Sequence, residues 1–384
     1  MKIAVDLTSL DDNFSGIEHY ARDITVNLLE LDRDNEYILI FKHQIFPDFT
    51  QYIDGKRVEA CVLERSRKLI FYQWSLPRFL NRLDADFFLF LAFPAPFLLR
   101  GKKFWYTAHD MGCFDCPETM KKKMVWYYRL LHRNNSRRCD GMITISQFSK
   151  ERIVSLLHCD PDKVHVIYCG ISDTFRRAGD ISEAECEKVR QKYSLPPGYF
   201  LCLSTLEPRK NMLLLLQAYL ELREEGKLSR GLVLAGRKGW KIENLLQQIQ
   251  KEHEMEKSDD NDMPGVQMTG FVDEEDLPVL YQMADCFVFP SLYEGFGIPP
   301  LEAMQMGTVV ISSDAPAMKE VLGDGAYYFH NNNKEDLKRV MLQVMSENED
   351  SLEKRKTAGK GRCGLFQYRN EAAKLLQLWK EEIR

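Results

Sequence analysis

Short apolar runs rich in β-branched and aromatic residues alternate with longer helical patterns along the whole chain. The apolar runs lie at 3–7, 37–41, 87–91, 104–108, 141–145 and 164–167, and again at 199–204, 231–235, 266–269, 286–289 and 309–312. Between several of them apolar residues recur at helical spacing, as they do in 212–225. Such alternation is typical of parallel sheets covered by helices on both faces. We therefore predict an α/β fold with doubly wound sheets.

The length of the chain indicates two domains. Its 384 residues exceed the roughly 250 to 300 at which a single core stops growing. A polar stretch after Phe175, ending in a Pro-Pro-Gly sequence at 196–198, is interpreted as a linker. We predict an N-terminal domain over 1–180, a C-terminal domain over 196–365 and a final helical segment over 366–384. Ligands of doubly wound sheets bind beyond the carboxyl ends of the strands, so the loops that follow strands hold the candidate site residues.

Composition argues against several classes of protein. The chain is 45% hydrophobic and 28% charged, as ordinary globular proteins are. Its ten cysteines are irregularly spaced, and the pair Cys113 and Cys116 lacks the second ligand pair of a zinc site, so neither a disulfide framework nor a metal site is predicted. The N-terminus has no apolar stretch typical of a signal peptide, and the apolar run 87–99 suits a buried strand followed by a loop. We expect a cytoplasmic protein with reduced thiols.

The charge is unevenly distributed. The net charge is −5, yet residues 51–150 hold twice as many Lys and Arg as Asp and Glu. Basic and aromatic residues interleave in this region, at Arg65, Arg67, Lys68, Phe71, Tyr72, Trp74, Arg78, Phe79 and Arg82, and then at Lys121 to Lys123, Trp126, Tyr127 and Tyr128. Such a surface suits peripheral contact with an anionic membrane. The alternative is that the aromatic residues belong to the core and the cations to a solvated face.

The most informative segment is 290–304, Pro-Ser-Leu-Tyr-Glu-Gly-Phe-Gly-Ile-Pro-Pro-Leu-Glu-Ala-Met. Two carboxylates, Glu294 and Glu302, flank a glycine-rich turn there. Gly295 and Gly297 permit positive φ and close backbone approach, and a helix N-terminus beside them suits an anion such as phosphate. The carboxylates would accept hydrogen bonds from two hydroxylated parts of one ligand, such as a sugar and a ribose. The alternative is a helix-capping turn with two solvated acids.

Two neighbouring cations, Arg209 and Lys210, follow the strand predicted at 199–204. They precede a helix predicted to begin near Asn211. Two cations beside a helix N-terminus form a strong site for a diphosphate. The alternative is a solvated pair of surface cations.

Three further loops after predicted strands hold candidate residues. Gly16 lies in the first loop, where a larger residue would crowd a ligand, although it could be a plain turn glycine. His109 could donate to a sugar hydroxyl or to a leaving phosphate, or could be structural. Val272 and Asp273 would approach a nucleotide base. Asp273 could accept from the amino and imino groups of guanine, or could equally cap a helix starting near Glu274.

These motifs, in this order along one chain, resemble glycosyltransferase family 4, whose signature is two glutamates separated by seven residues. The segments that carry the resemblance are 16–21, 107–110, 143–146, 205–211, 269–272 and 290–304. The resemblance implies the GT-B fold, in which two Rossmann-like domains face a cleft, with the N-terminal domain on the acceptor side. It also implies that the last helix packs back on the N-terminal domain, and that sugar transfer retains the anomeric configuration.

The resemblance assigns a role to each candidate. It implies catalytic roles for Glu294, Arg209, Lys210 and His109, and donor-binding roles for Glu302, Gly295, Phe296, Gly297, Gly16, Val272 and Asp273. The two cations would hold the donor diphosphate and stabilise the departing nucleotide, so no metal ion or other cofactor is expected. Glu294 would orient the transferred sugar.

The sequence Glu-Pro-Arg-Lys-Asn at 207–211 resembles that of mannosyltransferase-like members of the family, which build bacterial polysaccharides. It implies transfer of a hexose to a glycan or a lipid-linked acceptor. The first candidate for this hexose is mannose, with GDP-mannose as the donor. A UDP-sugar is the second candidate donor, and a non-catalytic nucleotide-sugar-binding protein of the same fold is the alternative from another class. The expected partners are the nucleotide sugar, the acceptor and an anionic membrane on the cytoplasmic side, with no nucleic acid.

The chain departs from the family pattern in two places. Many members have an additional arginine five or six residues before the lysine, whereas this chain has Ser204 and Thr205 there. Arg209 is therefore expected to carry more of the phosphate contact. In the first loop a single glycine follows Ser15, and acidic Glu18 comes after it, so the acceptor contacts are expected to differ from those of relatives with two glycines.

Overall fold

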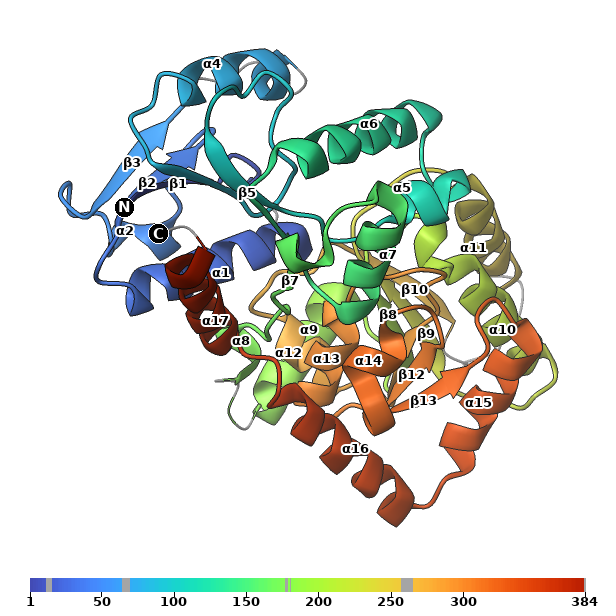
Figure 1. Ribbon diagram of the computed structural model, residues 1–384. Helices are drawn as coiled ribbons and strands as arrows, with labels where there is room; N and C mark the ends of the chain where they lie inside the picture. The colour runs from blue at the N-terminus through green and yellow to red at the C-terminus, as the bar shows by residue number, and fades with distance from the viewer. Residues whose placement is uncertain (12–15, 64–69, 177–178, 180, 257–264, 383–384) are drawn as a thin grey trace. The chain divides into compact units, whose positions relative to one another are not determined.

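The computed structural model describes residues 1–11, 16–63, 70–176, 179, 181–256 and 265–382. These residues form two compact units (Figure 1), which are described separately. Unit 1 comprises Met1–Gly170 and Phe366–Arg384, and unit 2 comprises Ile171–Leu365. Each unit contains a parallel sheet with helices on both faces, which confirms the predicted fold class.

The sheet of unit 1 has the strand order β3-β2-β1-β4-β5-β6-β7. Its strands are β1 (Lys2–Asp6), β2 (Glu36–Phe41), β3 (Val58–Val62), β4 (Phe87–Phe90), β5 (Lys103–Thr107), β6 (Gly141–Thr144) and β7 (Val164–Val166). The chain adds strands outward from β1 in one direction and then from β4 in the other, so the order reverses between β1 and β4. The apolar run 87–99 forms β4 and a loop, as predicted.

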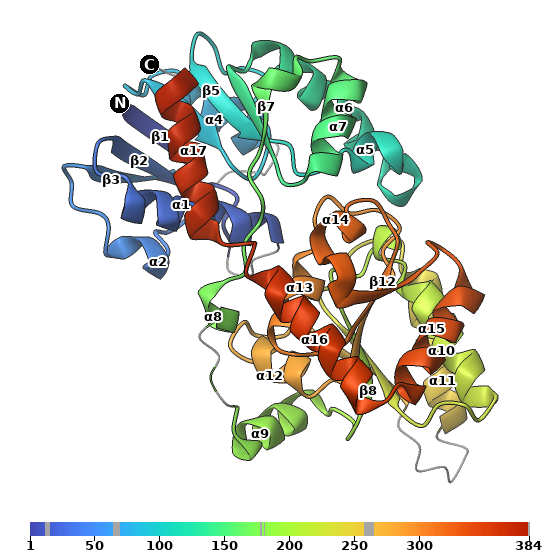
Figure 2. The ribbon, with the colours of Figure 1, turned by 60° about the horizontal axis from the view of Figure 1, so that its bottom comes forward.

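Helices cover both faces of this sheet. They are α1 (Gly16–Leu31), α2 (Pro47–Thr50), η1 (Phe71–Ser75), α4 (Leu76–Leu80), α5 (Gly112–Asp115), η2 (Pro117–Thr119), α6 (Lys122–Arg138), α7 (Gln147–Leu157), η3 (Pro161–Lys163) and α17 (Tyr368–Glu382). On one face α1 and α17 lie side by side (Figure 2). There Trp379 packs edge-on against Phe87 and Trp105, with ring centroids 5.7 and 6.4 Å apart. On the other face, side chains from η1, α4 and α7 join the core of the sheet.

The sheet of unit 2 has the strand order β10-β9-β8-β11-β12-β13. Its strands are β8 (Tyr199–Leu203), β9 (Gly231–Ala235), β10 (Val266–Gly270), β11 (Cys286–Phe289), β12 (Val310–Ser313) and β13 (Ala326–Phe329). The order reverses between β8 and β11. Fully buried apolar runs such as Cys286–Phe289 suit a parallel sheet that is covered on both faces.

The remaining elements of unit 2 are helices and helical turns. They are α8 (Asp173–Arg176), α9 (Glu183–Tyr193), η4 (Pro208–Lys210), α10 (Met212–Glu224), α11 (Glu243–Glu256), α12 (Leu277–Gln282), α13 (Ile298–Gln305), α14 (Met318–Leu322), η5 (Gly323–Gly325), α15 (Lys334–Ser346) and α16 (Glu349–Cys363). Side chains of α10, α11 and α15 form the core on one face of the sheet. Helix α16 packs on α13 at Gly359, where an added Cβ would lie only 3.0 Å from Cγ of Met304.

The linker interpretation misses one helix. Helix α9 lies within the polar stretch, and Ser182 and Glu185 form a capping box at its N-terminus. The edge strands β3 and β13 were not expected either. Residues 12–15, 64–69, 177–178, 180 and 257–264 lie outside the described residues, and the polar stretch 252–256 belongs to α11.

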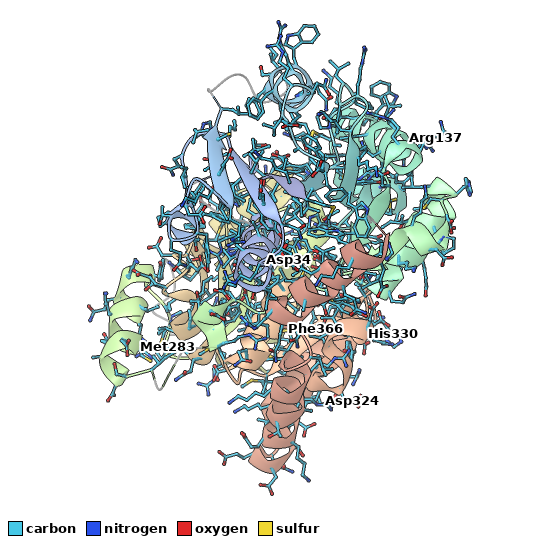
Figure 3. All side chains as sticks on the ribbon, turned by 60° about the vertical axis from the view of Figure 1, so that its left-hand side comes forward. Asp34, Arg137, Met283, Asp324, His330 and Phe366 are labelled. Atoms are coloured by element: carbon cyan, nitrogen blue, oxygen red, sulfur yellow. The ribbon has the colours of Figure 1, made fainter. Side chains whose placement is uncertain are left out.

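Figure 3 labels single residues that mark the ends of elements. Phe366 lies between α16 and α17, and Arg137 lies in the last turn of α6, where it is exposed. None of the described helices is both long enough and apolar enough to cross a membrane.

Candidate active site

The loop after β8 places the two predicted cations side by side. Pro208 begins the turn η4, in which the N–H of Lys210 donates to the carbonyl of Glu207 at 3.0 Å. Asn211 then takes up the left-handed conformation, with φ of 52°, which asparagine tolerates better than most residues, and α10 follows. A proline and an asparagine thus fix the turn from which Arg209 and Lys210 project.

The loop after β11 brings the glutamate motif to the same edge of the sheet. The N–H of Leu292 donates to the carbonyl of Arg209 at 2.8 Å, which joins the two loops. Gly297 has φ of 95°, and an added Cβ would lie 2.8 Å from Cε of Met318, so only glycine fits there. Since β8 and β11 flank the point where the strand order reverses, the two loops meet where doubly wound sheets bind ligands.

Glu294 forms the centre of an ion cluster with both cations. Its carboxylate is 2.5 Å from Nζ of Lys210 and 3.7 Å from the guanidinium of Arg209. The residue is only 5% exposed. Burial favours the neutral acid, but the charges of Lys210 and Arg209 outweigh it and hold the pKa of Glu294 below its usual value. The structure therefore brings together three of the four predicted catalytic residues.

A second carboxylate, Glu207, completes this cluster and was not predicted to have a role. Its Oε1 lies 3.2 Å from Nε of Arg209, and its side chain is 7% exposed. Arg209 also donates to the carbonyl of Tyr293 at 3.3 Å. Glu207 stands two residues before Arg209 in the motif, and this neighbouring position was the signal that could have identified it.

Glu302 lies in the second turn of α13, on the same motif as Glu294. The hydroxyl of Tyr281, from α12, donates to Oε2 of Glu302 at 2.8 Å. Tyr281 is fully buried, and burial together with the charge of Glu302 raises the pKa of its hydroxyl well above the usual value. The sequence patterns gave no signal for this contact between α12 and α13. Between the two glutamates, Gly295, Phe296 and Gly297 are all buried.

The loop after β10 holds Val272 and Asp273, and it is fixed by α9. Val272 is 5% exposed. The carboxylate of Asp273 lies 2.7 Å from Nζ of Lys192, and its N–H donates to the hydroxyl of Tyr193 at 3.1 Å. Helix α12 begins at Leu277, so the expected helix start near Glu274 is wrong, because 274–276 form a turn instead. The ion pair with Lys192 uses Oδ2 of Asp273, so a base contact by this carboxylate would use its other oxygen or share this one.

The two remaining predicted residues lie in unit 1. Gly16 is the exposed first residue of α1. His109 lies two residues after the end of β5, and its Nε2 lies 2.9 Å from the carbonyl of Leu91, so this nitrogen carries a proton and donates. The edge of the ring packs against Tyr20 of α1 at 5.2 Å. Burial lowers the pKa of His109 to about 4, so the neutral ring presents Nδ1 as an acceptor, which suits a sugar hydroxyl better than a phosphate.

Two further sequence-based questions concern the cysteine pair Cys113 and Cys116 and the binding of a metal ion. Cys113 is buried, and burial raises the pKa of its thiol to about 12, which disfavours a reactive thiolate. Among the described residues no cluster of three or more His, Cys, Asp or Glu side chains could hold a metal ion.

Comparison with known proteins agrees with the motifs. A family model described as Glycosyltransferase Family 4 matches residues 14–175, and one described as Glycosyl transferases group 1 matches residues 186–362. O-antigen chain mannosyltransferase B of Escherichia coli is 33% identical over 277 residues, which are 71% of this chain and 69% of that protein. The serotype-specific mannosyltransferase WbdA of Escherichia coli is 32% identical over 210 residues, which are 55% of this chain and 25% of that protein.

Solved structures share the fold. The structure of Anabaena Alr3699/HepE in complex with UDP and glucose has a TM-score of 0.74 at 16% identity, over 99% of this chain and 100% of that one. WaaG, a glycosyltransferase involved in lipopolysaccharide biosynthesis, has a TM-score of 0.71 at 13% identity, over 98% of this chain and 99% of that one. At these identities the likeness concerns the fold alone, which is the GT-B fold. The matches of both units to the family models and the similarity to the mannosyltransferases show that the chain is a glycosyltransferase and belongs to glycosyltransferase family 4.

Proposed function

We propose that the enzyme transfers mannose from GDP-mannose to a glycan or a lipid-linked acceptor, with retention of anomeric configuration, in the synthesis of a polysaccharide or glycoconjugate. The observation that carries the proposal is the ion cluster of Arg209, Lys210 and Glu294 where the strand order of unit 2 reverses. The names of the two Escherichia coli mannosyltransferases support mannose as the sugar.

The cluster has the chemistry that a departing diphosphate needs. When the bond between the sugar and the donor phosphate breaks, its electron pair remains on a phosphate oxygen. The positive charges of Lys210 and Arg209 stabilise that developing charge in a site from which water is largely excluded. Glu294 and Glu207 balance the two cations, and an arriving diphosphate would compete with these carboxylates for them.

The carboxylates then have separate tasks. Glu294, once released from Lys210, would accept hydrogen bonds from the hydroxyls of the transferred sugar and orient it. Glu302 would accept from the ribose, with Tyr281 fixing its other oxygen. In a front-face reaction the acceptor oxygen attacks on the side that the nucleotide leaves, and the acceptor proton passes to the departing phosphate. No protein nucleophile is required.

A donor screen tests this proposal. Nucleoside diphosphate release would be measured with GDP-mannose, UDP-glucose and UDP-galactose, for the wild type and for Lys210→Met. We expect GDP-mannose to be turned over fastest and the variant to lose this release. Turnover of a UDP-sugar alone would assign the enzyme to the second candidate donor, and binding without release of any nucleotide would support the non-catalytic alternative.

We also propose that unit 1 contacts an anionic membrane through one exposed surface, on the cytoplasmic side where the inner leaflet is negatively charged. The predicted aromatic residues divide in the structure: Phe71 is in the core, whereas Trp74 and Trp126 are 61% and 69% exposed. Gln73 donates to the hydroxyl of Tyr127 at 2.6 Å, so the elements that carry the two tryptophans are neighbours.

Several apolar and basic residues close to these tryptophans in the sequence are exposed as well. The exposed members of this surface, hereafter the tryptophan surface, are Ile70, Trp74, Arg78, Lys121, Lys122, Lys123, Met124, Trp126 and Leu130. Proteins that bind at a membrane interface typically place aromatic rings at the level of the headgroups. Neighbouring lysines then contact anionic lipids. Arg65, Arg67 and Lys68 lie outside the described residues and are not counted in this surface.

A further inference from the structure

Asp6 is a buried carboxyl group that the proposed reaction does not use. It is the last residue of β1 and is only 6% exposed. Its strand lies next to β4, at the point in unit 1 where the strand order reverses. Buried carboxylates are rare in proteins unless a cation or several hydrogen-bond donors compensate them.

The surroundings of Asp6 provide little such compensation. The backbone N–H of Thr8 donates to Oδ1 of Asp6 at 3.0 Å. Among the described residues no lysine, arginine or histidine forms an ion pair with it. Burial, the dominant influence, raises the pKa of Asp6 to about 6 despite the hydrogen bonds with Thr8. At neutral pH the charged form of Asp6 therefore lowers the stability of the fold. Such destabilised charged groups are common in ligand-binding sites.

The place of Asp6 in its sheet matches that of the donor cluster in the other sheet. In unit 2 the reversal point between β8 and β11 holds Lys210 and Glu294. In unit 1 the reversal point between β1 and β4 holds Asp6. The adjoining strand end holds His109, which is bonded to the carbonyl of Leu91 just after β4. Ligands of doubly wound sheets bind at such points, so the position itself suits ligand binding.

We infer that Asp6 binds hydroxyl groups of the acceptor sugar, an inference that rests on the proposed transfer reaction. A carboxylate accepts hydrogen bonds from two hydroxyls at once, and a sugar offers neighbouring hydroxyls. Those donors compensate the buried charge without a cation from the protein. Since the cluster proposed to bind the donor diphosphate lies in unit 2, a hydroxyl-binding group at the reversal point of unit 1 is assigned to the acceptor.

A purely structural role for Asp6 makes different predictions. The bond from the N–H of Thr8 could serve only to shape the turn after β1. Asp6→Asn keeps an oxygen for that bond and removes the charge. Asp32 provides a matched control, because it is 5% exposed and in the same unit but well compensated. It accepts from Tyr37 at 2.6 Å, from the side chain of Asn35 at 2.7 Å and from backbone N–H groups.

The test compares both variants with the wild type, using GDP-mannose and p-nitrophenyl α-D-mannopyranoside together with its four monodeoxy analogues. We expect Asp6→Asn to raise the KM for the mannoside on the order of tenfold or more, because a hydrogen bond to a charged group is lost. The affinity for GDP and the melting temperature should not fall. One deoxy analogue should be a poor acceptor for the wild type but equal to the parent mannoside for Asp6→Asn.

The control variant should behave in the opposite way. Asp32→Asn should lower the melting temperature and leave the KM for the mannoside unchanged. An unchanged KM in Asp6→Asn would overturn the inference while leaving the donor assignment intact, because GDP-mannose turnover is scored separately. A joint fall of melting temperature and GDP affinity in Asp6→Asn would also overturn it, in favour of a structural role.

Discussion

At the scale of single residues, the candidate active site is a compensated group of buried charges. Glu294 and Glu207 are carboxylates that burial alone would disfavour, and Arg209 and Lys210 make their burial tolerable. If a diphosphate binds here, its affinity is expected to depend on the whole cluster and not on one cation.

The first prediction concerns Lys210. Lys210→Met keeps an unbranched side chain but removes the charged Nζ, which lies 5.4 Å from the ring centroid of Phe289. We expect kcat to fall on the order of a hundredfold, because a charge that stabilises the leaving group is lost. Steady-state kinetics with GDP-mannose would measure the fall. Lys227→Met, at an exposed lysine of the same unit, serves as the control, and turnover of Lys210→Met equal to that of this control would refute the phosphate-site assignment.

The second prediction concerns Glu302 and Tyr281. Glu302→Ala should weaken the binding of free GDP, because the proposed ribose contact is lost. Tyr281→Phe should weaken it less, since the carboxylate remains but loses the hydroxyl that orients it. Titration calorimetry would give both affinities. Unchanged GDP affinity in Glu302→Ala would contradict the ribose assignment.

At the scale of elements, the sequence patterns identified most strands but not all. Continuous apolar runs such as Phe87–Phe90 and Cys286–Phe289 are buried on both faces and are easy to recognise. Strand β3 was missed because it lies at the edge of the sheet and most of its residues are half-buried. A charged residue, Glu59, is tolerated at such a position and interrupts the apolar pattern. Helix α9 was missed because its composition is polar, although its capping box at Ser182 was a readable start signal.

The residues of the site could be predicted more fully than their partners. Arg209, Lys210 and Glu294 stand in loops after strands, and parallel strands bring such loops to one edge. The contacts of Tyr281 with Glu302 and of Lys192 with Asp273 join helices or loops far apart in the chain. Contacts of this kind depend on how the elements pack, which no local pattern specifies.

The third prediction concerns the tryptophan surface on η1 and α6. The wild type should sediment with vesicles that contain anionic lipid, and binding should fall as salt rises. Replacing Trp74 and Trp126 together by alanine should weaken this binding at every salt concentration, because both rings are exposed and free to enter the interface. Absence of wild-type binding even at low ionic strength would reject the membrane proposal.

A second double variant controls for the loss of exposed apolar side chains in general. Phe271 and Leu365 are exposed apolar residues of unit 2, at 42% and 60%, and lie outside the tryptophan surface. Their replacement by alanine should leave vesicle binding unchanged. Equal weakening by both double variants would point to non-specific adsorption.

At the scale of the whole molecule, stability should respond to mild acid through buried histidines. His132 is 6% exposed, and burial lowers its pKa to about 4. Between pH 6.5 and 4 the unfolded chain binds a proton at this residue and the folded chain does not, so stability is lost as the pH falls. His109 acts in the same direction. Asp6, with its raised pKa, acts in the opposite direction.

The fourth prediction follows from this balance. Lowering the pH from 7 to 5 should cost about 2 kcal/mol of stability through His132 alone, so His132→Phe should show a smaller drop in melting temperature than the wild type. Thermal unfolding at the two pH values would measure it. His158→Asn is the control, because His158 is exposed and its left-handed backbone conformation suits asparagine. Equal drops in His132→Phe and the wild type would contradict the prediction.

The measurement that tests the central claim most directly is the anomeric configuration of the product formed from GDP-α-mannose. Wild-type enzyme would be incubated with this donor, labelled with ¹³C at C1, and a mannoside acceptor, and the new linkage would be read by NMR as GDP release is followed. We predict an α-linked product and a molar amount of GDP equal to that of the product. Lys210→Met should abolish both. A β-linked product, or transfer that persists in Lys210→Met, would contradict it.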